Sequence, residues 1–298
     1  VSAPLRVATG HDIGTTFFLT NERTVSGGFT RKQAPVEVRD FRLVQPVLTT
    51  VSGELSAALA VSRDFKRFAF ARGLRVVIVD ADGNVVSEAT LESRVLALAF
   101  AATGETLFAG LDKPGVIDVL SVADGTVQRS FKGDEFDSII GLRVSPDGSQ
   151  LLTLANCAKS ENQVHLWPAG GGAPRVIEVS AAYTVAFAPN GEFAIGYKTG
   201  QIKRFNSSGV KQGSLIVPGL GGRFGEVGHR AKIKALRYTA DGKHLFSVAS
   251  SASGSAVDLR VWNLQTNALV GSHLEAAQNF LGVDLSPNRD RLLVARRE

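Results

Sequence analysis

The sequence predicts an all-β fold built from one repeated unit. A short apolar strand, a polar turn and a second apolar strand return seven times along the 298 residues. The second residues of these turns are 40 to 51 residues apart, at Asn21, Arg63, Thr103, Pro146, Pro189, Ala240 and Pro287. A repeat of roughly 40–45 residues made of short strands is typical of a β-propeller. We therefore predict a seven-bladed β-propeller of four-stranded antiparallel blades, with a six-bladed ring carrying two extra strands as the alternative.

The first two strands of each blade are expected to be buried on both faces, and such strands read as near-continuous apolar runs. The predicted first strands are residues 15–19, 57–61, 95–100, 139–144, 184–187, 233–238 and 280–285. The predicted second strands are residues 24–29, 68–71, 107–111, 151–155, 193–197, 245–249 and 292–295.

Third and fourth strands are expected to alternate between apolar and polar residues, because they are partly solvated. The predicted third strands are residues 36–41, 74–80, 116–122, 163–167, 201–205 and 257–262. The predicted fourth strands are residues 43–48, 84–91, 126–131, 175–179, 213–217 and 268–274. Six blades are therefore complete in the sequence.

The seventh unit ends at Glu298 after two strands. An open ring would leave unpaired strand edges, which invite aggregation. We therefore expect residues 4–9 to close the ring by pairing with the last blade. The third strand of that blade is missing, disordered or supplied from outside this sequence. Because the repeat runs from end to end, residues 1–298 are expected to form one domain.

Composition indicates an ordinary globular chain, with 44% apolar and 20% charged residues. No apolar run approaches the roughly 18–20 residues that cross a bilayer, so no membrane span is expected. Cys157 is the only cysteine, which excludes an internal disulfide and favours a reducing compartment such as the cytoplasm. The chain has no methionine and opens at Val1, so we expect it to be excised or processed from a longer protein. The alternative that the chain is a processed exported protein remains.

The sixth unit resembles the WD40 repeat family. It contains Gly228-His229, then the run from Lys234 to Lys243 with the turn Thr239-Ala240-Asp241-Gly242, then Val257 to Leu264 with Trp262. In that family a histidine, a serine or threonine, an aspartate and a tryptophan form a hydrogen-bonded structural set within a blade. The resemblance implies this structural role for His229, Ser247 and Trp262. The aspartate expected six residues before the tryptophan is replaced by Ala256, so the repeat is degenerate.

Catalytic and cofactor motifs are absent from the sequence. The five histidines are His11, His165, His229, His244 and His273, and no two have the spacing of a local metal site. No Gly-x-Ser-x-Gly nucleophile motif, dinucleotide fingerprint or P-loop occurs. We therefore expect a non-enzymatic protein with no cofactor and no metal. An enzyme or small-ligand binder that uses polar groups at the central channel is the alternative.

The longest insertion, residues 218–232, lies between the fifth and sixth units and is rich in glycine and basic residues. Loops held by a rigid scaffold often carry binding residues, and aromatic and arginine side chains are frequent interface anchors. The partner-binding candidates in this loop are Arg223, Phe224, His229, Arg230 and Lys232. The insertions at residues 156–162 and 250–256 are expected on the opposite face of the molecule.

The formal net charge of +5 is compatible with an acidic partner. It is weaker than the concentrated basic stripe of a nucleic-acid binder, so nucleic acid or another anionic surface is only a second alternative. The function expected from the sequence is a protein-interaction module that binds a protein or peptide through its rim loops. Other domains of the same polypeptide are also expected partners.

Overall fold

The computed structural model describes residues 13–18, 23–28, 36–40, 47–51, 58–112, 115–133, 138–157, 161–222, 225–250, 256–276, 280–285 and 292–296. The regular structure within these residues is all β-strand. None of them forms a helix with the length and apolar character needed to cross a membrane. The predicted closing strand, residues 4–9, lies outside the described residues.

Six four-stranded antiparallel sheets follow one another along the chain, each in sequential strand order. The first contains β1 (Ile13–Phe18), β2 (Arg23–Gly28), β3 (Val36–Asp40) and β4 (Val47–Val51). The second contains β5 (Leu59–Val61), β6 (Arg67–Arg72), β7 (Arg75–Asp80) and β8 (Val85–Thr90). The third contains β9 (Val95–Phe100), β10 (Thr106–Leu111), β11 (Val116–Ser121) and β12 (Val127–Lys132).

The later sheets repeat this order. The fourth contains β13 (Ser138–Val144), β14 (Gln150–Asn156), β15 (Gln163–Pro168) and β16 (Arg175–Val179). The fifth contains β17 (Ala182–Phe187), β18 (Phe193–Tyr197), β19 (Ile202–Phe205) and β20 (Lys211–Ser214). The sixth contains β23 (Lys232–Tyr238), β24 (His244–Ser250), β25 (Ala256–Asn263) and β26 (Ala268–Ala276). Two smaller two-stranded sheets are formed by β21 (Gly221–Gly222) with β22 (Gly225–Glu226), and by β27 (Phe280–Leu285) with β28 (Leu292–Arg296).

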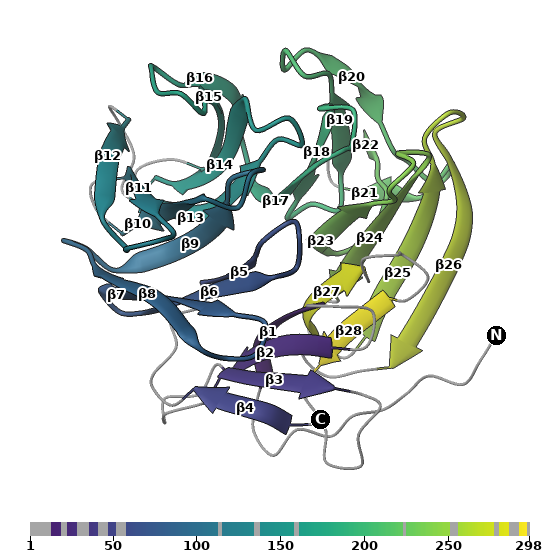
Figure 1. Cartoon of the computed structure of the whole chain (residues 1–298). Helices are drawn as coiled ribbons and strands as arrows, with labels where there is room; N and C mark the ends of the chain where they lie inside the picture. The colour runs from purple at the N-terminus through teal and green to yellow at the C-terminus, as the bar shows by residue number, and fades with distance from the viewer. Residues whose placement is uncertain are drawn as a thin grey trace.

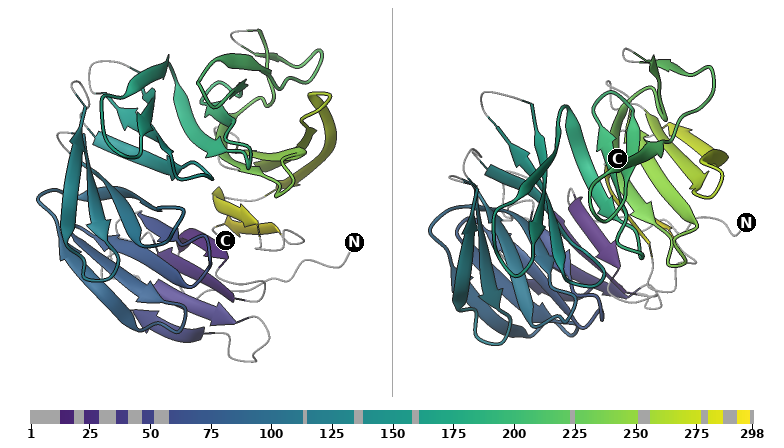
Figure 2. Two further views of the ribbon diagram at one scale, coloured as in Figure 1. Left: turned by 45° about the horizontal axis from the view of Figure 1, so that its top comes forward. Right: turned by 90° about the horizontal axis from the view of Figure 1, so that it is seen from above.

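The sheets are arranged around a common centre, with the first strand of each sheet innermost and the fourth outermost (Figures 1 and 2). Neighbouring first strands contact one another in the succession β1, β5, β9, β13, β17, β23 and β27, and β27 in turn contacts β1. Repeated four-stranded antiparallel sheets in this arrangement are compatible with a repeat β-propeller.

Apolar clusters lie between successive sheets from the second to the sixth. Leu107 packs between the second and third sheets, Trp167 between the third and fourth, Phe193 between the fourth and fifth, and Trp262 between the fifth and sixth. These four side chains have exposed fractions of 0%. The described core is therefore divided into layers between sheets, because the third, fourth and fifth sheets each bury both faces against their neighbours.

Burial differs from the expectation for the third strands. β7, β11 and β15 each contain four consecutive buried residues, so they do not alternate. First strands such as β9 and β17 are less completely buried than the second strands β10 and β18. The reason is geometric: the second and third strands lie between neighbouring sheets, whereas the first strands face the centre of the molecule.

Two predicted fourth strands also differ from the structure. The strand expected at residues 43–48 is β4 at Val47–Val51, and the one expected at 213–217 is β20 at Lys211–Ser214. β20 begins early because a tight turn precedes it: the Asn206 side chain accepts a hydrogen bond from the Val210 backbone N–H at 2.8 Å. The Val217 N–H then donates to the Val227 carbonyl, outside this sheet.

Turns between the first and second strands share one hydrogen-bond pattern in three sheets. The hydroxyls of Ser62, Ser145 and Thr239 donate to the carboxylate two residues later, each at 2.6 Å. A backbone N–H two residues beyond the carboxylate donates to it as well. In the turns of the fourth and sixth sheets the residue directly after the aspartate is a glycine, Gly148 or Gly242. Both have a positive φ, which glycine adopts without steric cost. These contacts explain why the repeat is most visible in its turns.

Candidate functional site

The long insertion between the fifth and sixth sheets contains a small hairpin. Its strands β21 and β22 pair through Gly221 with Glu226 and through Gly222 with Gly225. The Glu226 carboxylate accepts a hydrogen bond from the Gly219 backbone N–H at 2.8 Å. Below the hairpin, the Val227 N–H donates to the Leu220 carbonyl at 3.1 Å. The described part of this insertion is therefore hydrogen-bonded within itself.

The base of the hairpin is attached to the fifth sheet. The backbone N–H groups of Gly228 and His229 both donate to the Gly200 carbonyl, at 3.1 and 3.0 Å. Gly200 has a φ of +84°, and a Cβ there would lie 1.8 Å from the His229 carbonyl oxygen. The space at Gly228 is less restricted, since a Cβ on it would lie 3.0 Å from the Leu215 carbonyl oxygen and 3.3 Å from the Trp262 ring. The close approach of the backbone at Gly200 therefore requires glycine at that position.

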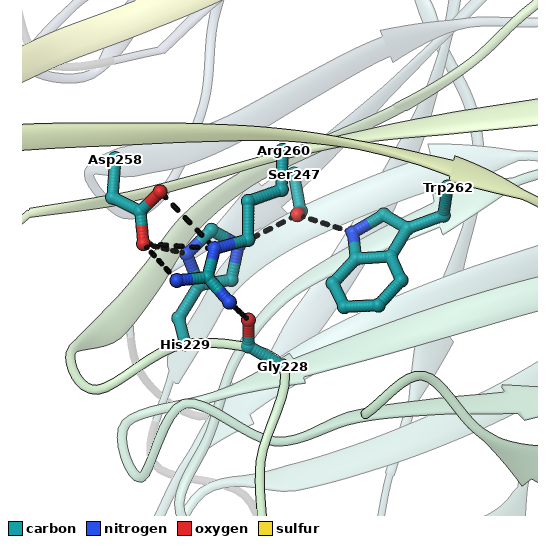
Figure 3. Close-up of polar contacts among 6 residues, drawn as sticks. All are labelled: Gly228, His229, Ser247, Asp258, Arg260 and Trp262. Atoms are coloured by element: carbon teal, nitrogen blue, oxygen red, sulfur yellow. Dashed lines mark hydrogen bonds and ion pairs between the residues drawn. The ribbon is translucent and has the colours of Figure 1, made fainter. Parts of the chain in front are cut away.

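Behind the loop, His229 is the centre of a buried polar network (Figure 3). The Trp262 indole N–H donates to the Ser247 hydroxyl oxygen at 2.8 Å. Ser247 Oγ lies 2.7 Å from His229 Nε2, and His229 Nδ1 lies 2.8 Å from Asp258 Oδ2. Every donor is satisfied when the neutral imidazole carries its proton on Nδ1, donating to Asp258 and accepting from Ser247.

Arg260 extends the network to the loop backbone. Its guanidinium donates to the Gly228 carbonyl at 2.6 Å and forms an ion pair with Asp258 at 2.9 Å (Figure 3). One continuous set of contacts thus connects Trp262, inside the sixth sheet, to the backbone immediately before Arg230. The conformation of the loop base is fixed by buried side chains of the sheet beside it.

The network sets the charge state of its members. Burial lowers the pKa of His229, and this outweighs the opposite effect of its hydrogen bond to Asp258. Burial raises the pKa of Asp258, but the hydrogen bonds from His229 and Arg260 and the positive charge of Arg260 lower this pKa by more, so the net shift is downward. Near neutral pH the network therefore contains a neutral imidazole, an ionised carboxylate and a guanidinium.

Two members of this network were not identified from the sequence. Asp258 lies four residues before Trp262, whereas the family pattern pointed to position 256, and Arg260 lies between them. Alternate residues of a strand point to the same face. Asp258, Arg260 and Trp262 are alternate residues of β25 and so point to the same face. This two-residue periodicity is the feature of the sequence that could have identified Asp258 and Arg260.

The predicted partner-binding residues differ in their placement. His229 has an exposed fraction of 0%, which corrects the expectation that its side chain is available at the surface. Arg230 is exposed and Lys232 is half-buried. Arg223 and Phe224, between β21 and β22, lie outside the described residues.

The expectation about the other two insertions was wrong. Lys232 pairs with Ser250 in the register of β23 and β24, so the connection after Ser250 begins at the same end of the sheet as the hairpin. Ser138 likewise pairs with Asn156, where the other insertion begins. In a four-stranded meander the strands alternate in direction. The connection into the first strand and the connection from the second to the third strand therefore lie at the same end of the sheet.

A partial copy of the network occurs in the fourth sheet. The Trp167 indole N–H donates to the Thr153 hydroxyl at 2.9 Å, as Trp262 does to Ser247. Nearby, His165 lies at the position of Arg260, and its Nε2 is 3.0 Å from Gln163 Oε1. Burial lowers the pKa of His165 to about 4, so its imidazole is neutral near pH 7.

Within the described part of the chain, no three His, Cys, Asp or Glu side chains lie together as a metal-binding group would require. Comparison with known proteins found no family model that matches this sequence. A search of curated proteins found no significant match either.

Proposed function

We propose that this chain is a non-catalytic protein-interaction module that binds an acidic protein or peptide segment. The binding surface, called here the hairpin face, is the end of the molecule where the first strands begin. It includes the β21–β22 hairpin with Arg223 and Phe224, followed by Arg230 and Lys232. The observation that carries the proposal is that the exposed Arg230 directly follows a loop base tied to a buried network.

The scaffold in this proposal is a closed seven-bladed propeller of the WD40 type. The succession of contacts from β1 through β27 and back to β1 supports a ring. The four-part set of His229, Ser247, Asp258 and Trp262 supports the family resemblance, since its chemistry is that of the WD40 structural set. Closure of the last blade by residues 4–9 belongs to the proposal.

Pre-organisation supports a binding role for the loop. A loop that is already ordered loses less conformational entropy on binding than a flexible one. The contacts of Gly228 and His229 with Gly200, and of Arg260 with Gly228, hold the backbone beside Arg230. Arg230 is therefore held in position by its neighbours, while its own side chain stays exposed.

Charge at the hairpin face indicates the type of partner. Arg230 and Lys198 are exposed, and Lys232 is half-buried. Glu226 is an exposed acid in the same insertion, and its carboxylate accepts a hydrogen bond from the Gly219 backbone N–H. The described residues here carry an excess of positive charge, which favours an acidic surface and accelerates its approach.

The test is a quantitative pull-down from native lysate. The site variant is Arg223→Glu with Arg230→Glu, and the matched control is Lys66→Glu with Lys243→Glu. Lys66 and Lys243 are exposed beside turns at the opposite ends of the first strands. We expect the wild type and the control to capture the same acidic protein at physiological salt, and the site variant to capture at least tenfold less. Equal capture by all three proteins would show that the hairpin face is not the binding surface.

A further inference from the structure

The first strands of the second to sixth sheets line a cavity on their inner side, called here the channel cavity. Its volume is about 220 Å³. Leu59 and Leu98 contribute apolar walls, and Arg143, Tyr183, Thr184 and Lys234 contribute polar groups. The polar residues come from β13, β17 and β23, which are consecutive first strands in contact with one another. One side of the cavity is therefore polar.

Arg143 brings a positive charge into the channel that no carboxylate of the described residues pairs with. Its Nη1 donates to the neighbouring Leu142 carbonyl at 2.7 Å. Arg237 occupies the same position relative to its turn, and its own charge is paired with Asp284 at 3.1 Å. Burial and the nearby Arg237 lower the pKa of Arg143 to about 10, partly opposed by Asp284, so it remains protonated at neutral pH.

Further cations lie around Tyr183. The ammonium of Lys234 is 5.3 Å from the Tyr183 ring centroid, and that of Lys232 is 4.7 Å from it. Within the described residues, neither lysine has a carboxylate partner. Counted back from the turn that follows each strand, Lys234 lies three residues earlier on β23 than Arg143 does on β13. This difference corresponds to about 10 Å along the strands. Lysine and arginine have long side chains, and both residues line the same cavity.

We propose that the channel cavity binds a small multivalent phosphate, of the size of pyrophosphate, between Lys234 and Arg143. Partly buried cations whose charge is not fully balanced by a carboxylate favour an anion that replaces the lost water. Pockets for drug-sized ligands span roughly 300–1,000 Å³, so a cavity of 220 Å³ fits a smaller molecule. Two cations at different depths favour a ligand that carries several charges in a small volume. Guanidinium also forms bidentate hydrogen bonds with phosphate oxygens.

Calorimetric titration with inorganic pyrophosphate at constant ionic strength tests the site. The variants are Lys234→Ala and Arg143→Gln, and the matched control is Lys211→Ala on the exposed strand β20. We expect one pyrophosphate to bind per wild-type chain. The two site variants should raise the Kd at least tenfold, and the control should not change it. Absence of binding to the wild type, or equal binding to all four proteins, would overturn the proposal.

Two further arms keep the result interpretable. ADP and citrate are titrated in parallel: binding of ADP points to a nucleotide as the source of the diphosphate, and binding of pyrophosphate alone points to the free ion. Citrate binding as tight as pyrophosphate would overturn the assignment to phosphate. Pyrophosphate should also protect Lys234 of the wild type from acetylation, measured by mass spectrometry, which needs no variant to fold. The site is independent of the proposed protein partner, so either proposal can fail alone.

Discussion

Ser247 is the residue on which the His229 network depends, because its hydroxyl both accepts from Trp262 and donates to His229. Replacing it by alanine leaves an indole N–H and an imidazole nitrogen buried without partners. A buried unsatisfied polar group costs about 1–3 kcal/mol. Ser247→Ala should therefore lower the free energy of unfolding by about 2 kcal/mol or more, measured by urea denaturation. Ser272→Ala, on the exposed part of β26, is the control. Equal stability of the two variants would contradict this role.

His165 should make stability depend on pH. Its folded pKa of about 4 lies below the ordinary value of 6.5 because of burial. Between these values the unfolded chain binds a proton that the folded chain does not bind. The contribution is fully present above pH 6.5 and is lost as the pH falls towards 4, on the order of 3 kcal/mol.

Replacing His165 by glutamine removes this proton. Urea denaturation of His165→Gln between pH 7.5 and 4.5 should show a shallower loss of stability than the wild type. His273→Gln, at an exposed position, is the control and should follow the wild-type slope. Identical slopes for the wild type and His165→Gln would mean that the pKa of His165 is the same in the folded and the unfolded chain.

At this scale, sequence reasoning identified His229, Ser247 and Trp262 as a set and did not find Asp258 or Arg260. The histidine, serine and tryptophan stand at positions that the family pattern names. Asp258 does not, because it contacts His229 from a position on β25 two residues beyond position 256. A fixed spacing describes one backbone path, whereas the same hydrogen bond can be made from a neighbouring position.

At the scale of elements, Gly196 shows how closely the second strand of one sheet packs on the next sheet. A Cβ at this position would lie 2.6 Å from Ile233 Cγ2 and 2.9 Å from Thr184 Cγ2. Overpacking in a core costs typically 1–3 kcal/mol. Gly196→Ala should therefore destabilise the protein by about 2 kcal/mol in urea denaturation.

Gly213 provides the control for this substitution. It lies on the outer strand β20, and a Cβ there would meet nothing within 4 Å. Gly213→Ala should leave the stability within about 0.5 kcal/mol of the wild type. A Gly196→Ala protein as stable as Gly213→Ala would show that the fifth and sixth sheets are less tightly packed than described.

Most elements were predictable from the sequence because polar turns punctuate apolar runs. The bounds of β9, β18 and β27 are the same as the predicted ranges. The β21–β22 hairpin was not predicted, since its strands are two residues long and contain only Gly and Glu in the described part. Such a hairpin depends on backbone hydrogen bonds, which leave no apolar pattern.

At the scale of the whole molecule, the contacts of β27 with both β1 and β23 make the last sheet the link between the two ends of the repeat. A chain that ends at Ala276 lacks this link and exposes the sheets on either side. Several kcal/mol should be lost, so the Tm should fall by roughly 10 °C or more and aggregation should increase. The control is a chain that ends at Arg296, which retains β28. Unchanged melting and a monomeric truncated protein would argue against a closed ring.

Architecture was predictable at this scale, because the repeat spacing reflects the stacking of similar units. The end of the molecule that carries each connection was not predicted correctly. The end at which a connection lies follows from the alternating strand directions of a meander. The pairing of Lys232 with Ser250 shows that the connection into β23 and the connection after β24 lie at the same end. The three insertions described above therefore begin or end on one face.

The central claim is that this hairpin face binds an acidic protein or peptide. Amide hydrogen exchange of the chain alone, compared with its complex with the protein captured in the pull-down, tests it most directly. We expect increased protection in residues 217–232 and at the starts of β17 and β23, with no change in the turns at 62–67 and 239–244. Protection confined to those turns, or to the outer strands, would contradict the account and place the binding surface elsewhere on the molecule.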